Sequence, residues 1–250
     1  MRLSTPRILV AATASLMLTS VLGGAAASSL GGLAPNKLGA FTYGAATGAP
    51  VVSAWENFNG ANGTNVNGTT TDGGGLTWSA PRCTWTLTGN QARSTASDCP
   101  LVVNPALVNS SVEATISRNG STAWDAGIIF QSNAAATRFL SAEYTAGSNG
   151  SLEIWSFNGG WALLGSVTNL YPGGVATAPA SIVLRVESPA PVSPATTSTL
   201  RFFINGTQVT TVTLSAANQG LYKIGGQTRS GVYTYYDSSS TFDNVHVDQP

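Results

Sequence analysis

The sequence predicts an all-β fold, an antiparallel β-sandwich of jelly-roll type, and three observations lead to this prediction. Apolar and polar residues alternate with period two in several segments, which marks strands with one covered face. Residues that form tight turns separate these segments. Periodic runs of strong helix formers do not occur after Leu22. About a dozen strands without crossover helices favour antiparallel pairing in two packed sheets.

The first residues are expected to be a targeting segment. Arg2 and Arg7 precede an apolar run from Ile8 to Leu22, and small residues follow up to Ala27. This arrangement is typical of a secretory signal peptide, which we assign to residues 1–27. Because the apolar run is shorter than the roughly 20 residues that span a bilayer, we expect no membrane span after cleavage.

The remaining chain divides into an arm and a domain. Residues 28–50 are rich in Gly and Ala and are interpreted as a flexible N-terminal arm, and residues 51–250 are assigned to the sandwich. Only 9% of the residues are charged, and without Arg2 and Arg7 the 11 basic residues fall to 9 against 11 acidic ones. A chain without a basic stripe is not expected to bind nucleic acid or anionic membranes.

Alternation is clearest in three segments, 111–117, 181–187 and 199–205, each with apolar residues on one face and polar residues on the other. The segment Asp125–Gln131 is more continuously apolar, and we expect it to be buried on both sides. Asn205-Gly206 follows the third alternating segment and predicts a hairpin, because a type I′ turn needs two residues that tolerate positive φ. "FNGGW" (Phe157–Trp161) predicts a second hairpin.

The two ends of the domain are predicted to pair. "AWENFNG" (Ala54–Gly60) reads as an opening strand, and "STFDNVHVD" (Ser240–Asp248) reads as the last one. Pairing first and last strands leaves fewer open sheet edges. We therefore expect Phe58 and Phe242 to lie inside, and His246 to lie on an outward face.

Cys83 and Cys99 are the only cysteines. Export places them in an oxidising compartment, where an even number favours a disulfide. The alternative is a metal site, which needs further Cys or His residues nearby, and the only histidine, His246, is far away in the sequence. We predict the disulfide.

The order of several segments resembles concanavalin A-like lectin/glucanase domains between about Trp55 and Asp248. The resemblance rests on "ENFNGANGT", "TDGGGLTW", "AGIIFQSNAAATRFLSAEY", "LEIWSFNGGWALLGS", "LRFFINGTQV" and "FDNVHV". The nearest likeness is to non-catalytic modules of exported bacterial proteins and of phage tail or fibre proteins. The resemblance implies a jelly-roll fold in a bacterial product, and lectins, glycosidases, adhesive modules and structural domains share it.

Catalysis is not expected from the acidic residues. Hydrolases of laminarinase type carry E-x-D-x-x-E on one strand, and this chain has no such motif. Carboxylates could still meet across strands, for instance Glu143 with Glu153, although solvated positions on an outer face are the simpler interpretation. His246 has no G-x-S-x-G serine to activate. We therefore predict a protein that is not an enzyme.

Calcium is the cofactor considered, because many members of the resembled fold bind it through oxygen ligands. If the first and last strands pair, Glu56 and Asn57 could converge with Asp243 and Asn244. The alternative is that Asp243 and Asn244 hydrogen-bond locally, as Asx residues do.

Aromatic residues are the candidate ligand-binding residues, because aromatic faces stack against the C–H side of sugar rings. The candidates are Trp155, Phe157, Trp161, Tyr233 and Tyr235. On Ser151–Phe157, alternation places Glu153 on the same face as the aromatic residues of that segment. The alternative is cross-strand packing, which stabilises a sheet by itself. Three other tryptophans, Trp78, Trp85 and Trp124, are expected in the core.

The sequence therefore predicts a secreted or cell-surface, lectin-like binding module for extracellular or cell-wall carbohydrate. One alternative is a structural or adhesive surface protein that contacts other proteins. A second alternative is a glycoside hydrolase with an atypical site.

Overall fold

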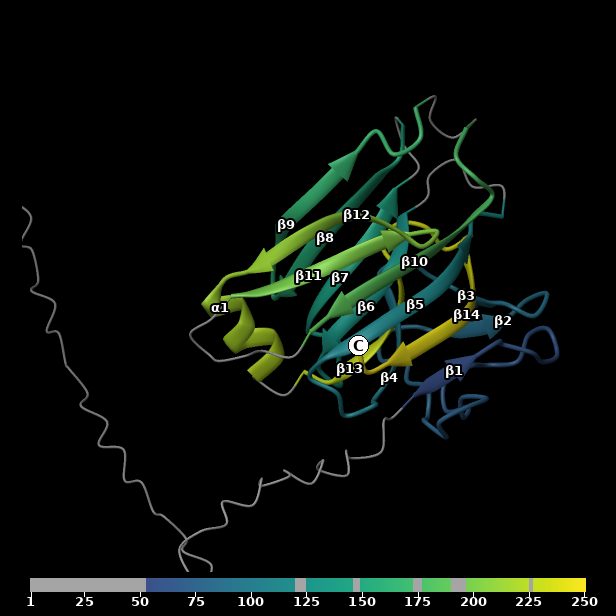
Figure 1. The fold of residues 1–250 in the computed structure, drawn as a ribbon. Coiled ribbons are helices and arrows are strands. Elements are labelled where there is room, and N and C mark those ends of the chain that lie inside the picture. The colour runs from purple at the N-terminus through teal and green to yellow at the C-terminus, as the bar shows by residue number, and fades with distance from the viewer. Residues whose placement is uncertain (1–52, 120–124, 146–148, 173–176, 190–196, 225–226) are drawn as a thin grey trace, which may run out of the picture. The chain divides into compact units, whose positions relative to one another are not determined.

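The computed structural model describes residues 53–250, apart from 120–124, 146–148, 173–176, 190–196 and 225–226. These residues form two antiparallel sheets, which confirms the predicted β-sandwich (Figure 1). The assigned signal peptide, the assigned arm and Trp124 lie outside the described residues.

The larger sheet has eight strands in the order β12-β11-β10-β5-β14-β3-β2, with β1 paired to β14. Its strands are β1 (Ala54–Glu56), β2 (Trp85–Leu87), β3 (Ala92–Ser94), β5 (Ser110–Ser117), β10 (Ser181–Ser188), β11 (Ser198–Ile204), β12 (Thr207–Leu214) and β14 (Thr241–Asp248).

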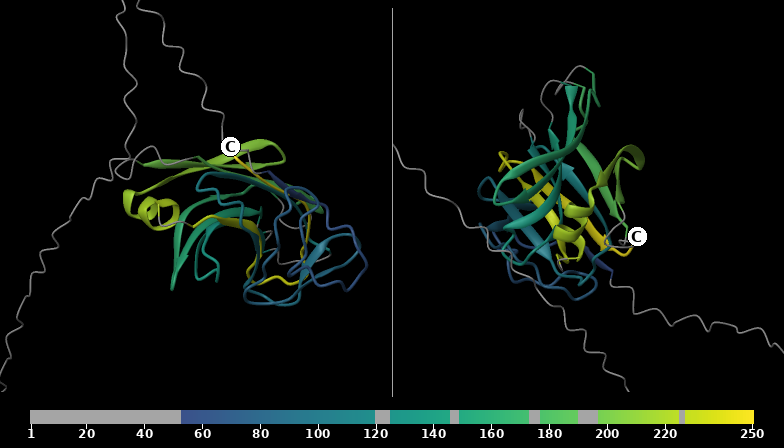
Figure 2. Two further views of the ribbon diagram at one scale, coloured as in Figure 1. Left: turned by 90° about the horizontal axis from the view of Figure 1, so that it is seen from below. Right: turned by 90° about the vertical axis from the view of Figure 1, so that its left-hand side faces the viewer.

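The smaller sheet has six strands in the order β4-β13-β6-β7-β8-β9, and it lies beneath the larger sheet in the left view of Figure 2. Its strands are β4 (Cys99–Val103), β6 (Asp125–Ser132), β7 (Arg138–Thr145), β8 (Ser151–Asn158), β9 (Trp161–Thr168) and β13 (Arg229–Thr234).

The core lies between the sheets and contains the apolar half of each alternating segment. On β5, Val112, Ala114 and Ile116 are fully buried, while the residues between them are partly exposed. Phe130 of the smaller sheet meets Phe202 of the larger one, with ring centroids 6.4 Å apart. Strand β6 is buried on both faces along nearly its whole length, as its continuous apolar run predicts.

The first and last strands pair, which confirms the expected closure. Ala54 is opposite Val247 in the β1–β14 register, and Figure 1 shows these two strands side by side. Phe58 and Phe242 are both buried. His246 is partly exposed, opposite the half-exposed Trp55, so it lies on the outer face as predicted.

Both predicted hairpins are present. Asn205 and Gly206 join β11 to β12 with φ values of 49° and 78°, the positive pair that a type I′ turn requires. Gly159, with φ of 73°, lies in the turn between β8 and β9. This second turn places Trp161 directly opposite Phe157.

One short helical segment was not predicted. Helix α1 (Ala216–Gln219) begins after Ser215, whose side chain accepts a hydrogen bond from the Asn218 amide, and continues into the π-helical turn η3 (Gly220–Ile224). Four residues are too few to show a helical period in the sequence. Among the described residues, no helix has the length and apolarity that a membrane crossing requires.

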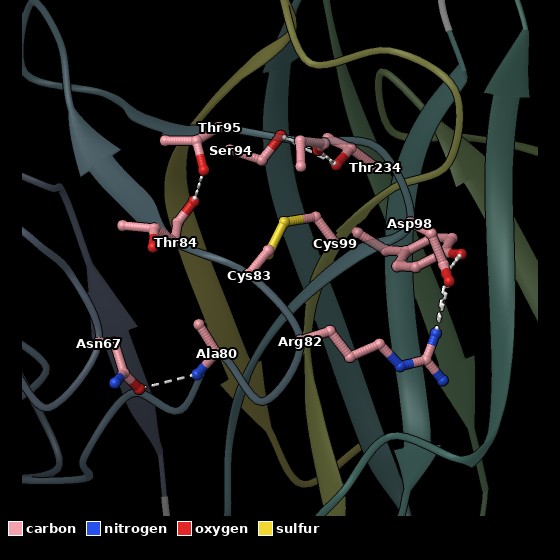
Figure 3. The surroundings of a disulfide bond; sticks show 12 residues. Asn67, Ala80, Arg82, Cys83, Thr84, Ser94, Thr95, Asp98, Cys99 and Thr234 are labelled. Atoms are coloured by element: carbon pink, nitrogen blue, oxygen red, sulfur yellow. Dashed lines mark hydrogen bonds and ion pairs between the residues drawn. A yellow bond between two sulfur atoms is a disulfide. The ribbon is translucent and has the colours of Figure 1, made fainter.

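The predicted disulfide joins Cys83 to Cys99, with 5.8 Å between the Cα atoms (Figure 3). Cys99 is the first residue of β4, and Cys83 lies in the loop before β2. The bond therefore fixes this loop to the smaller sheet. It also places the neighbouring Arg82 against Asp98, which matters for the site below.

Candidate functional site

A cleft of about 300 Å³ opens on the face of the six-stranded sheet that is turned away from the other sheet. Alternation along β8 places its wall, because Leu152 and Ile154 point into the core while Glu153 and Trp155 point outward. The described residues that line the cleft are Asp125, Glu143, Thr145, Glu153, Trp155, Trp161, Tyr235 and Tyr236.

Trp161 is the centre of an aromatic cluster on this face. Its ring centroid lies 5.0 Å from Phe157, 5.1 Å from Tyr235 and 6.2 Å from Trp155. Beneath it, Phe139 and Tyr233 are completely buried in a small second core. On this face, a buried layer that contains Phe139 and Tyr233 therefore underlies the more exposed aromatic side chains.

The five predicted ligand-binding residues come together, but at different depths. Trp155, Trp161 and Tyr235 line the cleft, whereas Phe157 and Tyr233 pack below it. The cross-strand packing that was the alternative to ligand binding is also present. Trp155 and Trp161 meet edge to face, with an interplanar angle of 83°. Whether these residues bind a ligand stays a prediction.

Glu143 and Glu153 are directly opposite each other in the β7–β8 register. The cross-strand meeting that the sequence allowed is therefore present. Asp125 lies in the next row, where it accepts a hydrogen bond from Thr145 Oγ1 at 3.3 Å. Asp125 was not predicted as a site residue from the sequence. The available signal was its position as the one acidic residue at the start of the apolar segment that forms β6.

The carboxylates affect one another. Burial, followed by the neighbouring Asp125 and Glu153 carboxylates, raises the pKa of Glu143 to about 8 against the opposing effect of a hydrogen bond from Ser141. Burial is also the main cause that raises the pKa of Asp125 to about 6. Glu153 accepts a hydrogen bond from Trp155 Nε1 at 3.0 Å. The cleft therefore holds a carboxyl group that keeps its proton at neutral pH.

Gly127 explains how Glu143, Glu153 and Tyr233 share one row. It lies on β6 opposite both Glu143 of β7 and Tyr233 of β13. A Cβ atom at this position would collide with the Ala142 carbonyl group of the neighbouring strand. Any side chain here would force β6 and β7 apart, which would separate the acidic row from the aromatic base.

Arg82 packs against aromatic residues next to the cleft. Its guanidinium Nη1 lies 2.8 Å and 3.0 Å from the two carboxylate oxygens of Asp98, as Figure 3 shows. Tyr233 donates a hydrogen bond to the same carboxylate at 2.5 Å. The guanidinium carbon also lies 5.5 Å from the ring centroid of Phe139 and 5.4 Å from that of Phe157. The disulfide, next in sequence, holds Arg82 in place.

The four residues predicted to bind calcium lie on the paired first and last strands. The Glu56 carboxylate accepts hydrogen bonds from the Phe58 amide at 2.8 Å and from Trp78 Nε1 at 3.1 Å. Asp243 Oδ1 accepts a local bond from the Asn244 amide at 2.7 Å, the alternative that the sequence left open.

Donors thus engage both carboxylates, an arrangement that does not match the oxygen cage that calcium requires. Within the described ranges, no group of three or more His, Cys, Asp or Glu side chains is placed to hold a metal ion. Calcium binding through Glu56, Asn57, Asp243 and Asn244 remains a prediction without support from these contacts.

The chain matches no family model and no curated protein. Among solved structures, it is similar to a variant of the GH43 protein BlXynB from Bacillus licheniformis, with a TM-score of 0.52 and 13% identity over 79% of this chain and 39% of that one.

Two further similar structures are carbohydrate-binding module CBM66 from Bacillus subtilis and a β-glucanase from Bacillus licheniformis. The first has a TM-score of 0.45 and 14% identity over 69% of this chain and 91% of that one. The second has a TM-score of 0.33 and 11% identity over 82% and 99%. At these identities the likeness concerns the fold alone. The match to the BlXynB variant, with a TM-score of 0.52, supports the β-sandwich.

Proposed function

We propose that this protein is a secreted carbohydrate-binding protein and that a sugar chain binds in the cleft of the six-stranded sheet. The observation that carries the proposal is the lining of the cleft, which combines four aromatic side chains with three carboxyl groups. Aromatic faces cover the C–H side of a sugar ring, and carboxyl oxygens accept hydrogen bonds from its hydroxyls. Ligand sites in proteins commonly combine apolar walls with a few polar groups.

The orientation of the rings indicates the form of the ligand. Trp155 and Trp161 stand nearly perpendicular, so they form a corner and not a flat platform. Tyr236 is 72% exposed at the rim, where it could contact a ring that extends beyond the cleft. This shape fits a soluble sugar chain better than the flat surface of a crystalline polysaccharide. The disulfide is consistent with export to an oxidising compartment.

Trp155→Ala and Trp161→Ala are each expected to weaken sugar binding by at least about tenfold, because truncated tryptophans at the centre of a binding site typically lose the most affinity. Retention on a panel of polysaccharides and titration calorimetry would measure this. Trp55→Ala is the matched control, since Trp55 is a half-exposed tryptophan of the other sheet.

Unchanged retention by folded Trp155→Ala and Trp161→Ala proteins would contradict the proposal. Retention on envelope material that free sugars do not reduce would instead support the adhesive alternative.

A second candidate function is glycoside hydrolysis, and the Glu143–Glu153 pair favours it. Residues directly opposite on antiparallel strands have Cβ atoms about 4.5–5.5 Å apart, so the two side chains project from adjacent points on one face. Retaining hydrolases use two carboxyl groups about 5–5.5 Å apart. Glu143 carries the proton that a general acid must give to the leaving oxygen. Glu153 would attack the anomeric carbon and form the covalent sugar ester that water then cleaves.

If the pair is catalytic, the protein releases reducing sugar, and Glu143→Gln and Glu153→Gln each lower the rate by at least about a hundredfold. Glu113→Gln on the other sheet is the control and leaves the rate unchanged. If the unmodified protein binds a polysaccharide but releases no sugar, the result contradicts hydrolysis and supports only the binding function.

A further inference from the structure

The cleft is acidic and contains no compensating cation among its described lining residues. Three of these eight residues are carboxylic acids, and none is Lys, Arg or His. Arg82, which packs against the neighbouring aromatic residues, already donates hydrogen bonds to both carboxylate oxygens of Asp98. The Asp98 carboxylate therefore already neutralises the positive charge of this guanidinium group.

Glu143 is the acid for which the lack of a nearby cation among the described lining residues matters most. Its side chain borders the cleft although the residue is only 3% exposed. Oε1 accepts a hydrogen bond from Ser141. Without an opposite charge, the ionised form of this buried carboxyl group is unfavourable, and neighbouring acids make it more so, so the group keeps its proton. A ligand that brought a positive charge and N–H donors would stabilise the ionised form, and the proton would be released on binding.

The aromatic walls favour the same kind of ligand. A cation within about 6 Å of a tryptophan or tyrosine face is attracted by the π electrons of the ring. Trp155, Trp161, Tyr235 and Tyr236 border the space that the three acids share. The aromatic side chains of the cleft can therefore both stack on a sugar ring and attract a cation. The acidic side chains of the same cleft can pair with that cation.

We infer that the cleft selects a cationic sugar, a chain of glucosamine units with free amino groups, over neutral or acidic sugars. This inference rests on the proposed carbohydrate-binding function and names the class of sugar. The amino group would approach Glu143 and Glu153, while the ring stacks on Trp155 or Trp161. Uronic acids would be rejected, because their carboxylates would face those of the cleft.

The experiment compares four β-1,4-linked oligosaccharides of equal length, built from glucosamine, N-acetylglucosamine, glucose or glucuronic acid. Calorimetry is performed near neutral pH, where Asp125 is ionised and part of the free amines is still charged. We expect the glucosamine chain to bind at least about tenfold more tightly than either neutral chain, and the acidic chain to bind least. The preference should decrease as salt is added, because screening weakens partly exposed charge pairs.

The Glu143→Gln/Glu153→Gln double variant should lose the preference for glucosamine, so that the ratio of its affinities for the glucosamine and glucose chains falls to about one. Glu113→Gln is the matched control, because it removes one carboxylate from the outer face of the eight-stranded sheet, where Glu113 lies opposite Arg185. The control should keep the full preference.

Equal affinity for the glucosamine and glucose chains, or a preference that persists in the double variant, would overturn the inference. If the neutral chains bind and Trp155→Ala weakens them, the proposed function stands and only the selectivity fails. If none of the four chains binds, and no other polysaccharide is retained, the proposed function fails together with the inference.

Discussion

Phe242→Ala is expected to lower the free energy of unfolding by about 3–5 kcal/mol, the usual loss for a phenylalanine removed from a packed core. Phe242 is fully buried on β14, and its ring lies edge to face against Trp85 at a centroid distance of 5.4 Å. Strand β14 pairs with β1, β3 and β5, so it connects the strands from the beginning of the domain to the rest of the larger sheet. A cavity at Phe242 would weaken this connection.

Urea unfolding followed by circular dichroism would measure the change. Phe203→Ala is a matched control, because Phe203 belongs to the same sheet but is partly exposed, with the Arg185 guanidinium 4.1 Å from its ring centroid. The control should lose much less stability. If both variants lost the same free energy of unfolding, or if Phe242→Ala lost less than about 1 kcal/mol, Phe242 would not be packed in the core between the sheets.

The fold could be predicted because its main signal is local. Alternation on β5, β10 and β11 identifies a covered face within seven or eight residues, without knowledge of the partner strands. The pairing of first and last strands could also be inferred, since Phe58 and Phe242 need burial. Strands β2 and β3 and helix α1 are only three or four residues long, and such segments show no period.

The site could be predicted only in part, because its depth depends on contacts between distant segments. Alternation on β8 correctly directs Trp155 and Glu153 outward. No local pattern reveals that Tyr233 is buried, since Arg82 and Asp98, more than a hundred residues away, help to cover and bind it. The meeting of Asp125 with Glu143 likewise depends on the register between β6 and β7.

The second large effect is a loss of stability as pH rises, caused by Glu143. Its pKa is about 8 in the folded protein and near 4.5 in an unfolded chain. Between these values the folded protein holds a proton that the unfolded chain has lost, so the free energy of unfolding decreases with increasing pH by about 1.4 kcal/mol per unit. The stabilisation is complete below about pH 4.5 and is lost as pH rises through about 8. Asp125 acts in the same direction, but only up to about pH 6.

Two variants separate these contributions. Glu143→Gln keeps a neutral side chain at all pH values, so its stability should be nearly constant between about pH 6 and 8, where the unmodified protein loses stability. Asp125→Asn should keep this loss between pH 6 and 8 but show a smaller decrease at lower pH, because the folded-state pKa of Asp125 is about 6. Urea midpoints measured across this range would distinguish the two. An equal slope for the unmodified protein and Glu143→Gln above pH 6 would mean that Glu143 is already ionised there. It would then lack the proton that the hydrolytic role requires, while the acidic cleft inferred for amino sugars would remain.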